Sequence, residues 1–447
     1  MKKNFDVFIN KKIQSFNKTI IVDSDKSISI RSLLFGSIAN KISYVKNILE
    51  SEDVLSAIEC LKKLGVKITK KKGFVIINGK GIGSLYAKKN LKLNFGNSGT
   101  LARLLIGMLT TTPNLELNLS GDHSLKKRSM KKLITLMSKF GATFIPKKKY
   151  NFPFKIISSL YPVGINYKAG VSAQLKSAVM LAGLNAYGTT KIYEKEMSRD
   201  HTERLLLKNK STIKVKTINK NRIIEIKGKN QIKNFNMRVF GDPSSAAFFC
   251  ALTTILKGSS LKILNVGINP TRLGFYELLN KFGAKIKFVN LKKINNEPSA
   301  DILVKHAKLR PIKASKKYYV KATDEYPILF VLAGLTKGIS IFRGIDDLAN
   351  KESNRIIEMQ KILNQVGIKS SFSQNELKIY GKGLINASKS KIITKNLGDH
   401  RICMSTFILS ILTGAKAKIK NFETVNTSSP SFLKIMSNLG AKFEIQK

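Results

Sequence analysis

The amino-acid sequence predicts an α/β fold of two similar domains, each built from three repeated units of helix and strand. Two phrases that recur along the chain, together with its length, lead to this prediction. The 447 residues are enough for two ordinary domains with buried cores, and the apolar fraction of 43% is typical of a globular protein. A single unit is too small to bury its own hydrophobic face, so neighbouring units must pack against each other.

The first phrase consists of the end of an amphipathic helix, then a glycine, then a strand. It reads LKKLGVKI from Leu61, and its glycine recurs at intervals of 76, 142, 84 and 73 residues. The interval of 142 is about two periods, and RLLLKNKSTIKV from Arg204 is a degraded copy midway, without the glycine. A helix that ends in a left-handed residue favours glycine there. The five glycines expected to end helices in this way are Gly65, Gly141, Gly283, Gly367 and Gly440.

The second phrase is a polar head of small residues that opens an apolar helix. Its six copies start 71, 76, 69, 83 and 74 residues apart, so they share the period of the first phrase. The heads start at Asp25, Gly96, Ser172, Gly241, Asp324 and Gly398. Their polar residues can simply cap the helices. However, several heads also carry Lys or Arg, and a cation at a helix N-terminus is unfavourable unless an anion joins it.

Three units per domain divide the chain near residue 240. We expect residues 24–240 to form one three-repeat domain, and residues 1–23 with 241–447 to form the other, discontinuous one. The N-terminal segment is assigned to the second half because the first head starts only at Asp25. We expect the helix N-termini of both domains to face an interdomain cleft, which would be the active site.

The net charge is the unusual feature of the composition, since 79 basic and 28 acidic residues give +51. Binding to nucleic acid is one explanation, because basic surfaces neutralise phosphates. However, 67 of the basic residues are lysines scattered along the chain, and no RNP motif, zinc finger or basic heptad accompanies them. We therefore favour a lysine-rich surface that steers small anions. The arginines that lie inside motifs are candidates for gripping phosphate or carboxylate: Arg31, Arg103, Arg128, Arg199, Arg204, Arg355 and Arg401.

The sequence favours neither a membrane protein nor a metalloprotein. No apolar run approaches the roughly 20 residues of a membrane helix, and the N-terminal residues lack the apolar core of a secretory signal. The three cysteines, Cys60, Cys250 and Cys403, lie far apart in apolar contexts, which argues against disulfides and a metal site. We expect a cytoplasmic protein, with no metal and no membrane partner, whose cysteines fill the core.

Eight motifs occur in the order in which one enzyme family carries them, and the chain resembles that family over essentially its whole length. The family is that of the 5-enolpyruvylshikimate-3-phosphate (EPSP) synthases, or 3-phosphoshikimate 1-carboxyvinyltransferases. The motifs are DKSISIR (25–31), GNSGTLAR (96–103), GDHSLKKR (121–128), SAQLKSA (172–178), SRDHTE (198–203), GDPSSAAFF (241–249), DEYPIL with KESNR (324–329 and 351–355) and DHR (399–401). Ala173, the stretch 199–203 and the lack of a lysine in TSSP (427–430) are similar to the family's second subgroup.

The resemblance implies an enolpyruvyl transferase fold, with an inside-out α/β barrel in each domain. It also implies a step of the shikimate pathway, toward chorismate and the aromatic amino acids. The enolpyruvyl group of phosphoenolpyruvate would move to the 5-hydroxyl of shikimate-3-phosphate, with release of phosphate and without a cofactor. Joining two polyanions requires several cations, and protonating the vinyl carbon while the hydroxyl attacks requires a positioned acid and base. We expect the protein to act as a monomer.

By motif position, the resemblance implies a set of residues for each ligand. For phosphoenolpyruvate they are Lys26, Gly99, Arg128, Gln174, Arg355 and Arg401. For shikimate-3-phosphate they are Lys26, Ser27, Arg31, Ser172, Ala173, Gln174, Ser198 or Arg199, Asp324 and Lys351. Asp324 would face the 5-hydroxyl, and Glu352 would carry the proton to the vinyl carbon with help from Lys26. Without the resemblance, Asp324 would more often be a helix cap and Glu352 part of a solvated surface.

The nearest alternative is the sister enzyme that transfers the same group to UDP-N-acetylglucosamine. That family uses a cysteine on a mobile loop and a Lys-Asn pair near its start. Here Ser27 follows Lys26, and the cysteines lie in apolar contexts rather than in a polar loop. A nucleic-acid-binding protein would rest on net charge alone. An inactive scaffold is at odds with the intact set of Lys, Arg, Asp and Glu residues in the motifs.

Overall fold

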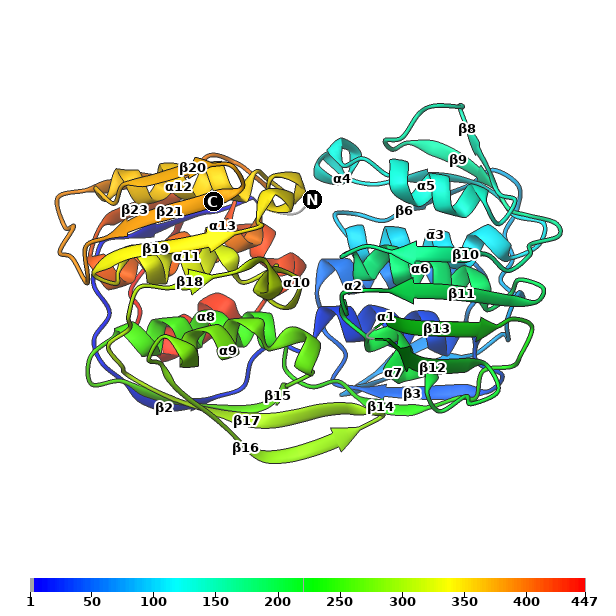
Figure 1. Cartoon of the computed structure of the whole chain (residues 1–447), viewed down its shortest axis with the longest axis horizontal. Helices are drawn as coiled ribbons and strands as arrows, with labels where there is room; N and C mark the ends of the chain where they lie inside the picture. The colour runs from blue at the N-terminus through cyan, green and yellow to red at the C-terminus, as the bar shows by residue number, and fades with distance from the viewer. Residues whose placement is uncertain (1–3, 220, 447) are drawn as a thin grey trace. The chain divides into compact units, whose positions relative to one another are not determined.

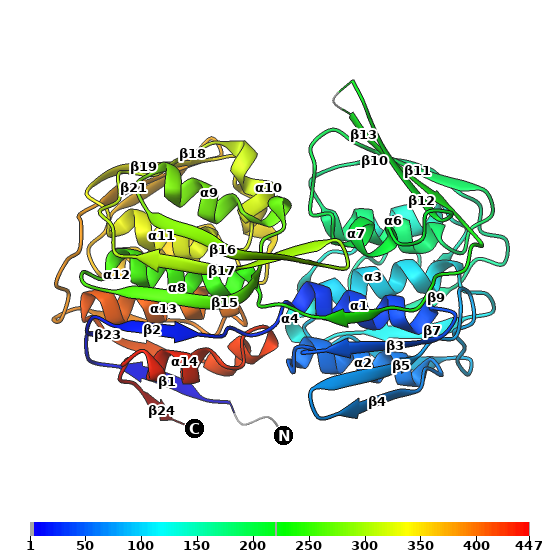
Figure 2. The ribbon, with the colours of Figure 1, turned by 90° about the horizontal axis from the view of Figure 1, so that it is seen from below.

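The computed structural model describes residues 4–219 and 221–446 of the chain. The chain divides into two compact units (Figures 1 and 2). Unit 1 comprises Met1–Asp23, Phe240–Lys292 and Pro298–Lys447, and unit 2 comprises Ser24–Val239 and Lys293–Glu297. The sequence gives no sign that residues 293–297 belong to a different unit from the residues on either side of them. They belong to unit 2 because they contact it: the Arg204 guanidinium donates to the Asn296 carbonyl at 2.8 Å.

Six four-stranded sheets, three in each unit, account for the strands of the described residues. In every sheet the first two strands are parallel, and the third is antiparallel to the second. The sheets of unit 2 are, in spatial order, β14 (Asn236–Arg238), β3 (Ile42–Lys46), β5 (Phe74–Asn78), β4 (Ile68–Lys71); β6 (Leu91–Asn94), β7 (Glu116–Ser120), β9 (Phe154–Ile157), β8 (Thr143–Ile145); and β10 (Asn166–Ala169), β11 (Thr189–Glu194), β13 (Asn221–Lys227), β12 (Ile213–Ile218). The sheets of unit 1 are β2 (Asn17–Ile20), β15 (Ser260–Gly267), β17 (Glu297–Lys305), β16 (Lys285–Ile294); β18 (Lys313–Ala314), β19 (Gly338–Arg343), β21 (Glu376–Gly381), β20 (Ser370–Ser373); and β22 (Lys391–Ile393), β23 (Lys416–Ile419), β1 (Asp6–Ile9), β24 (Glu444–Gln446). The repeated pattern confirms the α/β architecture built from six similar units.

Some strands complete sheets far from their place in the sequence. The N-terminal strand β1 pairs with β23, with Val7 opposite Ile419, and β2 lies parallel to β15. Strand β14 lies parallel to β3, with Met237 opposite Val45. Strands β1 and β2 therefore belong to sheets of unit 1. Strand β14, near the end of the segment Ser24–Val239, completes the first sheet of unit 2.

Each unit contains three helices that open with a polar head and are buried along most of their length. In unit 2 they are α1 (Lys26–Ile38), α3 (Gly99–Thr111) and α6 (Ala173–Gly183), and in unit 1 they are α8 (Pro243–Ile255), α11 (Tyr326–Gly334) and α13 (His400–Thr413). Every residue of α8, α11 and α13 is buried. A helix that is apolar all round must be covered on all sides, and in Figure 1 these helices lie among the sheets of their own unit.

The remaining helices include the five that precede the glycines of the first phrase. They are α2 (Glu52–Lys63), α4 (His123–Lys127), α5 (Lys131–Ser138) and α7 (His201–Leu206) in unit 2, and α9 (Gly274–Lys281), α10 (Tyr319–Ala322), α12 (Arg355–Gln365) and α14 (Phe432–Asn438) in unit 1. The five glycines of the first phrase have φ angles of +83°, +95°, +107°, +75° and +97°, which confirms the predicted left-handed helix ends. The degraded copy forms the short helix α7, and β12 follows it.

Close packing of α3 on α6 sets the distance between two of the heads. A Cβ atom at Gly107 would lie 2.4 Å from the carbonyl oxygen of Ala178, so only glycine allows the two backbones to approach this closely. The N-termini of the two helices, at Gly99 and Ala173, therefore lie close enough for their side chains to interact.

Candidate active site

Five of the six heads, all within the described residues, are closed by a side-chain cap. The cap residues are Asp25, Ser98, Ser172, Asp242 and Asp399, each of which accepts a hydrogen bond from a backbone N–H in the first turn. The exception is the head at Asp324. Helix α11 begins after Glu325, whose side chain makes no capping bond. Asp324 is therefore not a helix cap, and its carboxylate is directed instead to Arg355.

In unit 2, Lys26 is the first residue of α1 and lies beside Asp53. Its Nζ is 3.1 Å from Asp53 Oδ2, and the two side chains are 17% and 5% exposed. A cation at a helix N-terminus is destabilising, and the carboxylate offsets that cost. No sequence pattern marks Asp53 as a partner of Lys26, because an acidic residue in the first turn of a helix such as α2 has an ordinary explanation in the helix dipole.

Two guanidinium groups lie against the start of α3. A Cβ atom at Gly99 would be 2.7 Å from Nη1 of Arg103 and 2.9 Å from Nη1 of Arg128. Glycine is therefore required if both arginines are to approach this helix end. Arg128 also donates to the side-chain oxygen of Asn97 at 2.9 Å, which holds it beside the helix N-terminus. Two cations at one helix N-terminus make a strongly anion-attracting position.

Gln174 lies at the head of α6 and is oriented by the head of α3. Its Oε1 accepts a hydrogen bond from Arg103 at 2.9 Å, and its Nε2 donates to Thr100 Oγ1 at 3.0 Å. Arg103 also donates to the carbonyl oxygen of Gly99 at 3.1 Å. The sequence singled out Arg103 only as a motif arginine, and in the structure it orients Gln174 together with Thr100.

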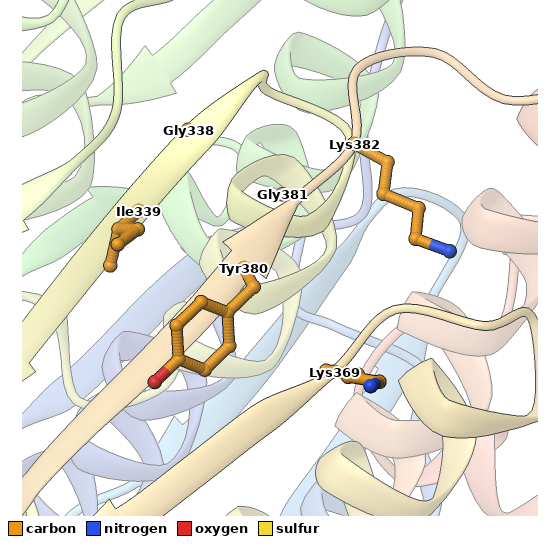
Figure 3. Close-up of a pocket in the computed structure, with 6 residues that line it drawn as sticks. All are labelled: Gly338, Ile339, Lys369, Tyr380, Gly381 and Lys382. Carbon is orange, nitrogen blue, oxygen red and sulfur yellow. The ribbon is translucent and has the colours of Figure 1, made fainter.

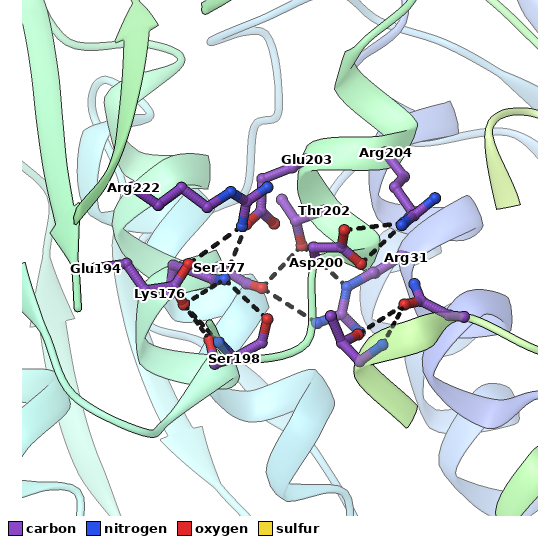
Figure 4. Close-up of polar contacts among 12 residues, drawn as sticks. Arg31, Lys176, Ser177, Glu194, Ser198, Asp200, Thr202, Glu203, Arg204 and Arg222 are labelled. Carbon is purple, nitrogen blue, oxygen red and sulfur yellow. Dashed lines mark hydrogen bonds and ion pairs between the residues drawn. The ribbon is translucent and has the colours of Figure 1, made fainter. Parts of the chain in front are cut away.

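Arg31 is buried and contacts three elements of unit 2. Its guanidinium donates to Thr202 Oγ1 at 3.0 Å, to Ser177 Oγ at 3.1 Å and to the carbonyl of Ser27 at 3.1 Å (Figure 4). Burial lowers the pKa of Arg31 to about 10. Arg31 thus joins α1 to α6 and α7, whatever contact it makes with a substrate.

The sequence left open whether Ser198 or Arg199 contacts a ligand. Ser198 is fully buried, and its hydroxyl donates to Glu194 Oε1 at 2.6 Å. Its proton is thereby committed to a carboxylate. Arg199, the next residue, is only partly buried. Ser172 and Ala173 are also partly buried, and the Ser172 hydroxyl accepts a hydrogen bond from the Leu175 N–H at 3.4 Å.

In unit 1, three carboxylates surround the buried guanidinium of Arg355. Its Nε is 2.9 Å from Asp399 Oδ2, its Nη2 is 2.7 Å from Glu352 Oε2, and its Nη1 is 3.8 Å from Asp324 Oδ1. Burial alone would lower the pKa of Arg355, but the charges of Asp399 and Glu352 outweigh burial and raise it above its usual value. The two carboxylates that the motifs nominate as base and acid therefore lie at one cation.

Lys351 is held next to this group by Asp347. Its Nζ is 2.6 Å from Asp347 Oδ2, which also accepts a hydrogen bond from the Tyr319 hydroxyl at 2.8 Å. Burial and the neighbouring charge of Asp347 raise the pKa of Tyr319. No motif marked Asp347, because it lies in a short 3-10 helix (Asp346–Asn350) outside the recurring phrases.

Arg401 is a buried cation whose donors are largely unused. The residue is 4% exposed, and its Nε and Nη1 have no hydrogen-bond partner among the residues that the structure describes. Its guanidinium lies 5.7 Å from the centre of the Phe248 ring. Buried guanidinium N–H groups without acceptors are costly, so this position is suited to an anionic ligand.

Other features of the described residues have no part in these clusters. A surface cavity of about 300 Å³ is lined by Gly338, Ile339, Lys369, Tyr380, Gly381 and Lys382, so its lining includes no residue of the eight motifs (Figure 3).

Cys60, Cys250 and Cys403 are buried and unpaired, as expected of core residues. Within residues 4–219 and 221–446, we find neither a helix long and apolar enough to cross a membrane nor three His, Cys, Asp or Glu side chains grouped for a metal ion.

Comparisons with known proteins give one consistent result. The family model for EPSP synthase (3-phosphoshikimate 1-carboxyvinyltransferase) matches residues 10–436. The 3-phosphoshikimate 1-carboxyvinyltransferase of Zymomonas mobilis is 37% identical over 443 residues, which are 98% of this chain and 97% of that protein. A solved structure of the Acinetobacter baumannii EPSP synthase matches with a TM-score of 0.85 and 34% identity, over 99% of this chain and 100% of the other. The enolpyruvyl transferase NikO of Streptomyces tendae matches with a TM-score of 0.76 over 100% of this chain and 99% of its own, and at 12% identity it shows a shared fold.

Proposed function

Since this chain belongs to the EPSP synthase family, we propose that the carboxylates around Arg355 carry out its acid-base chemistry and that the motif cations hold its two substrates. The reaction transfers the enolpyruvyl group of phosphoenolpyruvate to the 5-hydroxyl of shikimate-3-phosphate and releases phosphate. The relatives favour neither UDP-N-acetylglucosamine as acceptor nor a nucleic acid as partner.

The observation that carries the proposal is the placement of Asp324 and Glu352 at different nitrogen atoms of Arg355. Asp324 accepts the proton of the 5-hydroxyl as the hydroxyl oxygen bonds to the central carbon of phosphoenolpyruvate. Glu352 delivers a proton to the terminal vinyl carbon, and Lys26 assists. The tetrahedral adduct then loses a proton from its new methyl group as the carbon–oxygen bond to phosphate breaks, which restores the vinyl group and releases phosphate. The reaction needs both a proton acceptor and a proton donor, and two carboxylates at one cation can divide these roles.

Glu352 must hold a proton before it can deliver one. In the arrangement described above, its carboxylate pairs with Arg355 at 2.7 Å, which favours the ionised form. When the anionic phosphoenolpyruvate binds at Arg355, it competes for the guanidinium and adds negative charge beside Glu352. Both effects favour proton uptake by Glu352. Substrate binding thereby prepares the acid.

Shikimate-3-phosphate is assigned to residues of two heads of unit 2, to the segment that carries Ser198 and Arg199, and to two residues of unit 1. The geometry favours Arg199 over Ser198, because the Ser198 hydroxyl already donates to Glu194. The Ser172 hydroxyl accepts its capping bond, so its own O–H can donate to a phosphate oxygen. The full set proposed for this substrate is Lys26, Ser27, Arg31, Ser172, Ala173, Gln174, Arg199, Asp324 and Lys351.

Phosphoenolpyruvate is assigned to cations that the fold buries or holds at a helix N-terminus, where a positive charge is unfavourable unless an anion binds it. Arg401 is buried with unused donors, and Arg128 is held against the N-terminus of α3 beside Gly99. An anion that carries both phosphate and carboxylate satisfies such groups. The full set proposed for this substrate is Lys26, Gly99, Arg128, Gln174, Arg355 and Arg401.

Three expectations from the sequence stay predictions. These are an active site in a cleft between the two domains, a monomeric state and a cytoplasmic location. Both proposed ligand sets draw on residues of both units, which supports the first. Small-angle scattering with and without the two substrates tests whether ligands draw the units together, and sedimentation tests the monomer.

The assay that tests the proposed function measures phosphate release from phosphoenolpyruvate with each acceptor in turn. We expect release that requires shikimate-3-phosphate and does not occur with UDP-N-acetylglucosamine. Release with the UDP sugar, and none with shikimate-3-phosphate, would overturn the assignment.

A further inference from the structure

A largely buried network of charged side chains, those of Lys176, Glu194, Glu203 and Arg222, contacts Ser198 (Figure 4). At its centre is Lys176 on α6. Its Nζ is 2.8 Å from Glu194 Oε1 and 2.8 Å from Glu203 Oε1, and none of the three side chains is more than 1% exposed. Glu194 ends β11, and Glu203 belongs to α7. The network thus joins a helix, a strand end and a second helix.

Arg222 on β13 closes the network from its outer side. Its Nη1 is 3.1 Å from Glu194 Oε2 and 3.0 Å from Glu203 Oε1, and its side chain is 15% exposed. Two cations thus balance two carboxylates. Because an unpaired buried ion is strongly destabilising, each member depends on the others for its position.

The network also holds Ser198 by both its backbone and its side chain. Glu194 Oε1 accepts hydrogen bonds from the Ser198 N–H at 2.8 Å and from its hydroxyl at 2.6 Å. Lys176 Nζ donates to the Ser198 carbonyl at 3.4 Å. The peptide that leads into Arg199 is therefore fixed by charged groups, and such hydrogen bonds are stronger than neutral ones.

We propose that Lys176, Glu194, Glu203 and Arg222 are positioning residues that aim Arg199 at the phosphate of shikimate-3-phosphate. This inference rests on the proposed contact between Arg199 and that substrate. The four residues do not touch the substrate. They determine where the Ser198–Arg199 peptide points, and a small misplacement of a binding group is enough to weaken binding substantially.

The first test is Glu194→Gln, studied through the KM values of the two substrates. The amide keeps the shape of the side chain, but its NH2 group must face either the Arg222 guanidinium or the donors of Ser198, so one set of contacts is lost. We expect the KM for shikimate-3-phosphate to rise at least about tenfold, while the KM for phosphoenolpyruvate and kcat change less than about threefold. A purely structural role would reduce the amount of folded enzyme and leave this ratio of KM values unchanged.

The matched control is Glu225→Gln on the same strand as Arg222. Among the residues that the structure describes, Glu225 forms a single ion pair, at 3.8 Å with the more exposed Lys216, so both KM values should stay at their wild-type levels. If Glu194→Gln proves unstable, Arg222→Gln removes only the outer bridge and should raise the KM for shikimate-3-phosphate at least about threefold. A folded variant of either kind with an unchanged KM for shikimate-3-phosphate overturns the inference.

A double-variant cycle separates this inference from the proposed substrate contact. Arg199→Ala alone tests the contact, which is wrong if the KM for shikimate-3-phosphate does not change. If the network acts through Arg199, Glu194→Gln adds less than about twofold to the effect of Arg199→Ala. An equal effect of Glu194→Gln with and without Arg199 shows that the network does not act through Arg199 and refutes the positioning role.

Discussion

Asp324 and Glu352 contact the same guanidinium: Nη1 of Arg355 lies 3.8 Å from Asp324, and Nη2 lies 2.7 Å from Glu352. Arg355 is in turn anchored by Asp399, which also caps α13 through the Arg401 N–H at 3.0 Å. One buried cation therefore sets the positions of both carboxylates. An anion that binds this guanidinium would change the electrostatic environment of both at once, and in the proposed mechanism this links substrate binding to the proton transfers.

We predict that Glu352→Gln retains both substrates but slows turnover at least about 100-fold, as expected for the loss of a proton carrier. The amide can still accept a hydrogen bond from Arg355, so the local structure is preserved. Phosphate release measures turnover, and calorimetry measures substrate binding. The control is Glu358→Gln, in the first turn of α12, the helix that begins at Arg355, where the glutamate pairs with Lys361 on the protein surface. Turnover within about threefold of the wild-type value would remove Glu352 from its assigned role.

Gly99→Ala should weaken the binding of phosphoenolpyruvate more than that of shikimate-3-phosphate. The added Cβ would lie 2.7 Å from Arg103 and 2.9 Å from Arg128, so both flexible side chains must move away from the N-terminus of α3. We expect the KM for phosphoenolpyruvate to rise at least about fivefold, with little change in the thermal midpoint. Gly170→Ala is the control, because no heavy atom lies within 4 Å of its added Cβ. Equal effects of the two substitutions would show that the space at Gly99 is unimportant for this ligand.

Arg401→Met should separate stability from binding. In the absence of substrates, the substitution removes a buried cation with unused donors, so we expect an unchanged or higher thermal midpoint. The charge of Asp242 remains paired with Arg272 at 3.1 Å. The KM for phosphoenolpyruvate should rise at least about tenfold. Arg310→Met, on the exposed surface, controls for the change in net charge. A KM for phosphoenolpyruvate that stays at the wild-type value would contradict the assignment of Arg401.

The stabilising effect of Glu194 should disappear at low pH. Burial raises the pKa of Glu194, but the charge of Lys176 and the hydrogen bonds from Lys176 and Ser198 outweigh burial, so the pKa lies below its usual value of 4.5. A carboxylate with a depressed pKa stabilises the fold above its unfolded-state pKa, and this stabilisation is lost as the pH falls through the folded-state pKa. The free energy of unfolding of the wild type should therefore exceed that of Glu194→Gln near pH 7, and the difference should shrink progressively below about pH 4.5. Denaturant unfolding of both proteins at several pH values checks this, and a difference independent of pH would contradict it.

The sequence by itself determined the repeated architecture and nominated most residues of the proposed site. Helix ends that need a left-handed glycine and heads that cap buried helices are local requirements, so Gly65 and Asp25 could be interpreted without knowing their distant neighbours. The recurrence of these local signals at one period then predicted six similar units. The motifs nominated Arg355 and Glu352, which the structure places in contact.

Only the tertiary structure decided which charges meet. Asp53 beside Lys26, Asp347 beside Lys351 and Arg103 on Gln174 are partners that no motif marks. The ion pairs around Lys176 were also decided by the tertiary structure, because their carboxylates come from a strand end and a separate helix. The spacing of apolar residues indicates which face of a helix or strand is buried, but it does not indicate which other helix or strand covers that face. The partner of a buried charge is set by the packing of whole helices and sheets, and in a chain this rich in lysine the sequence offers too many candidate cations for each carboxylate.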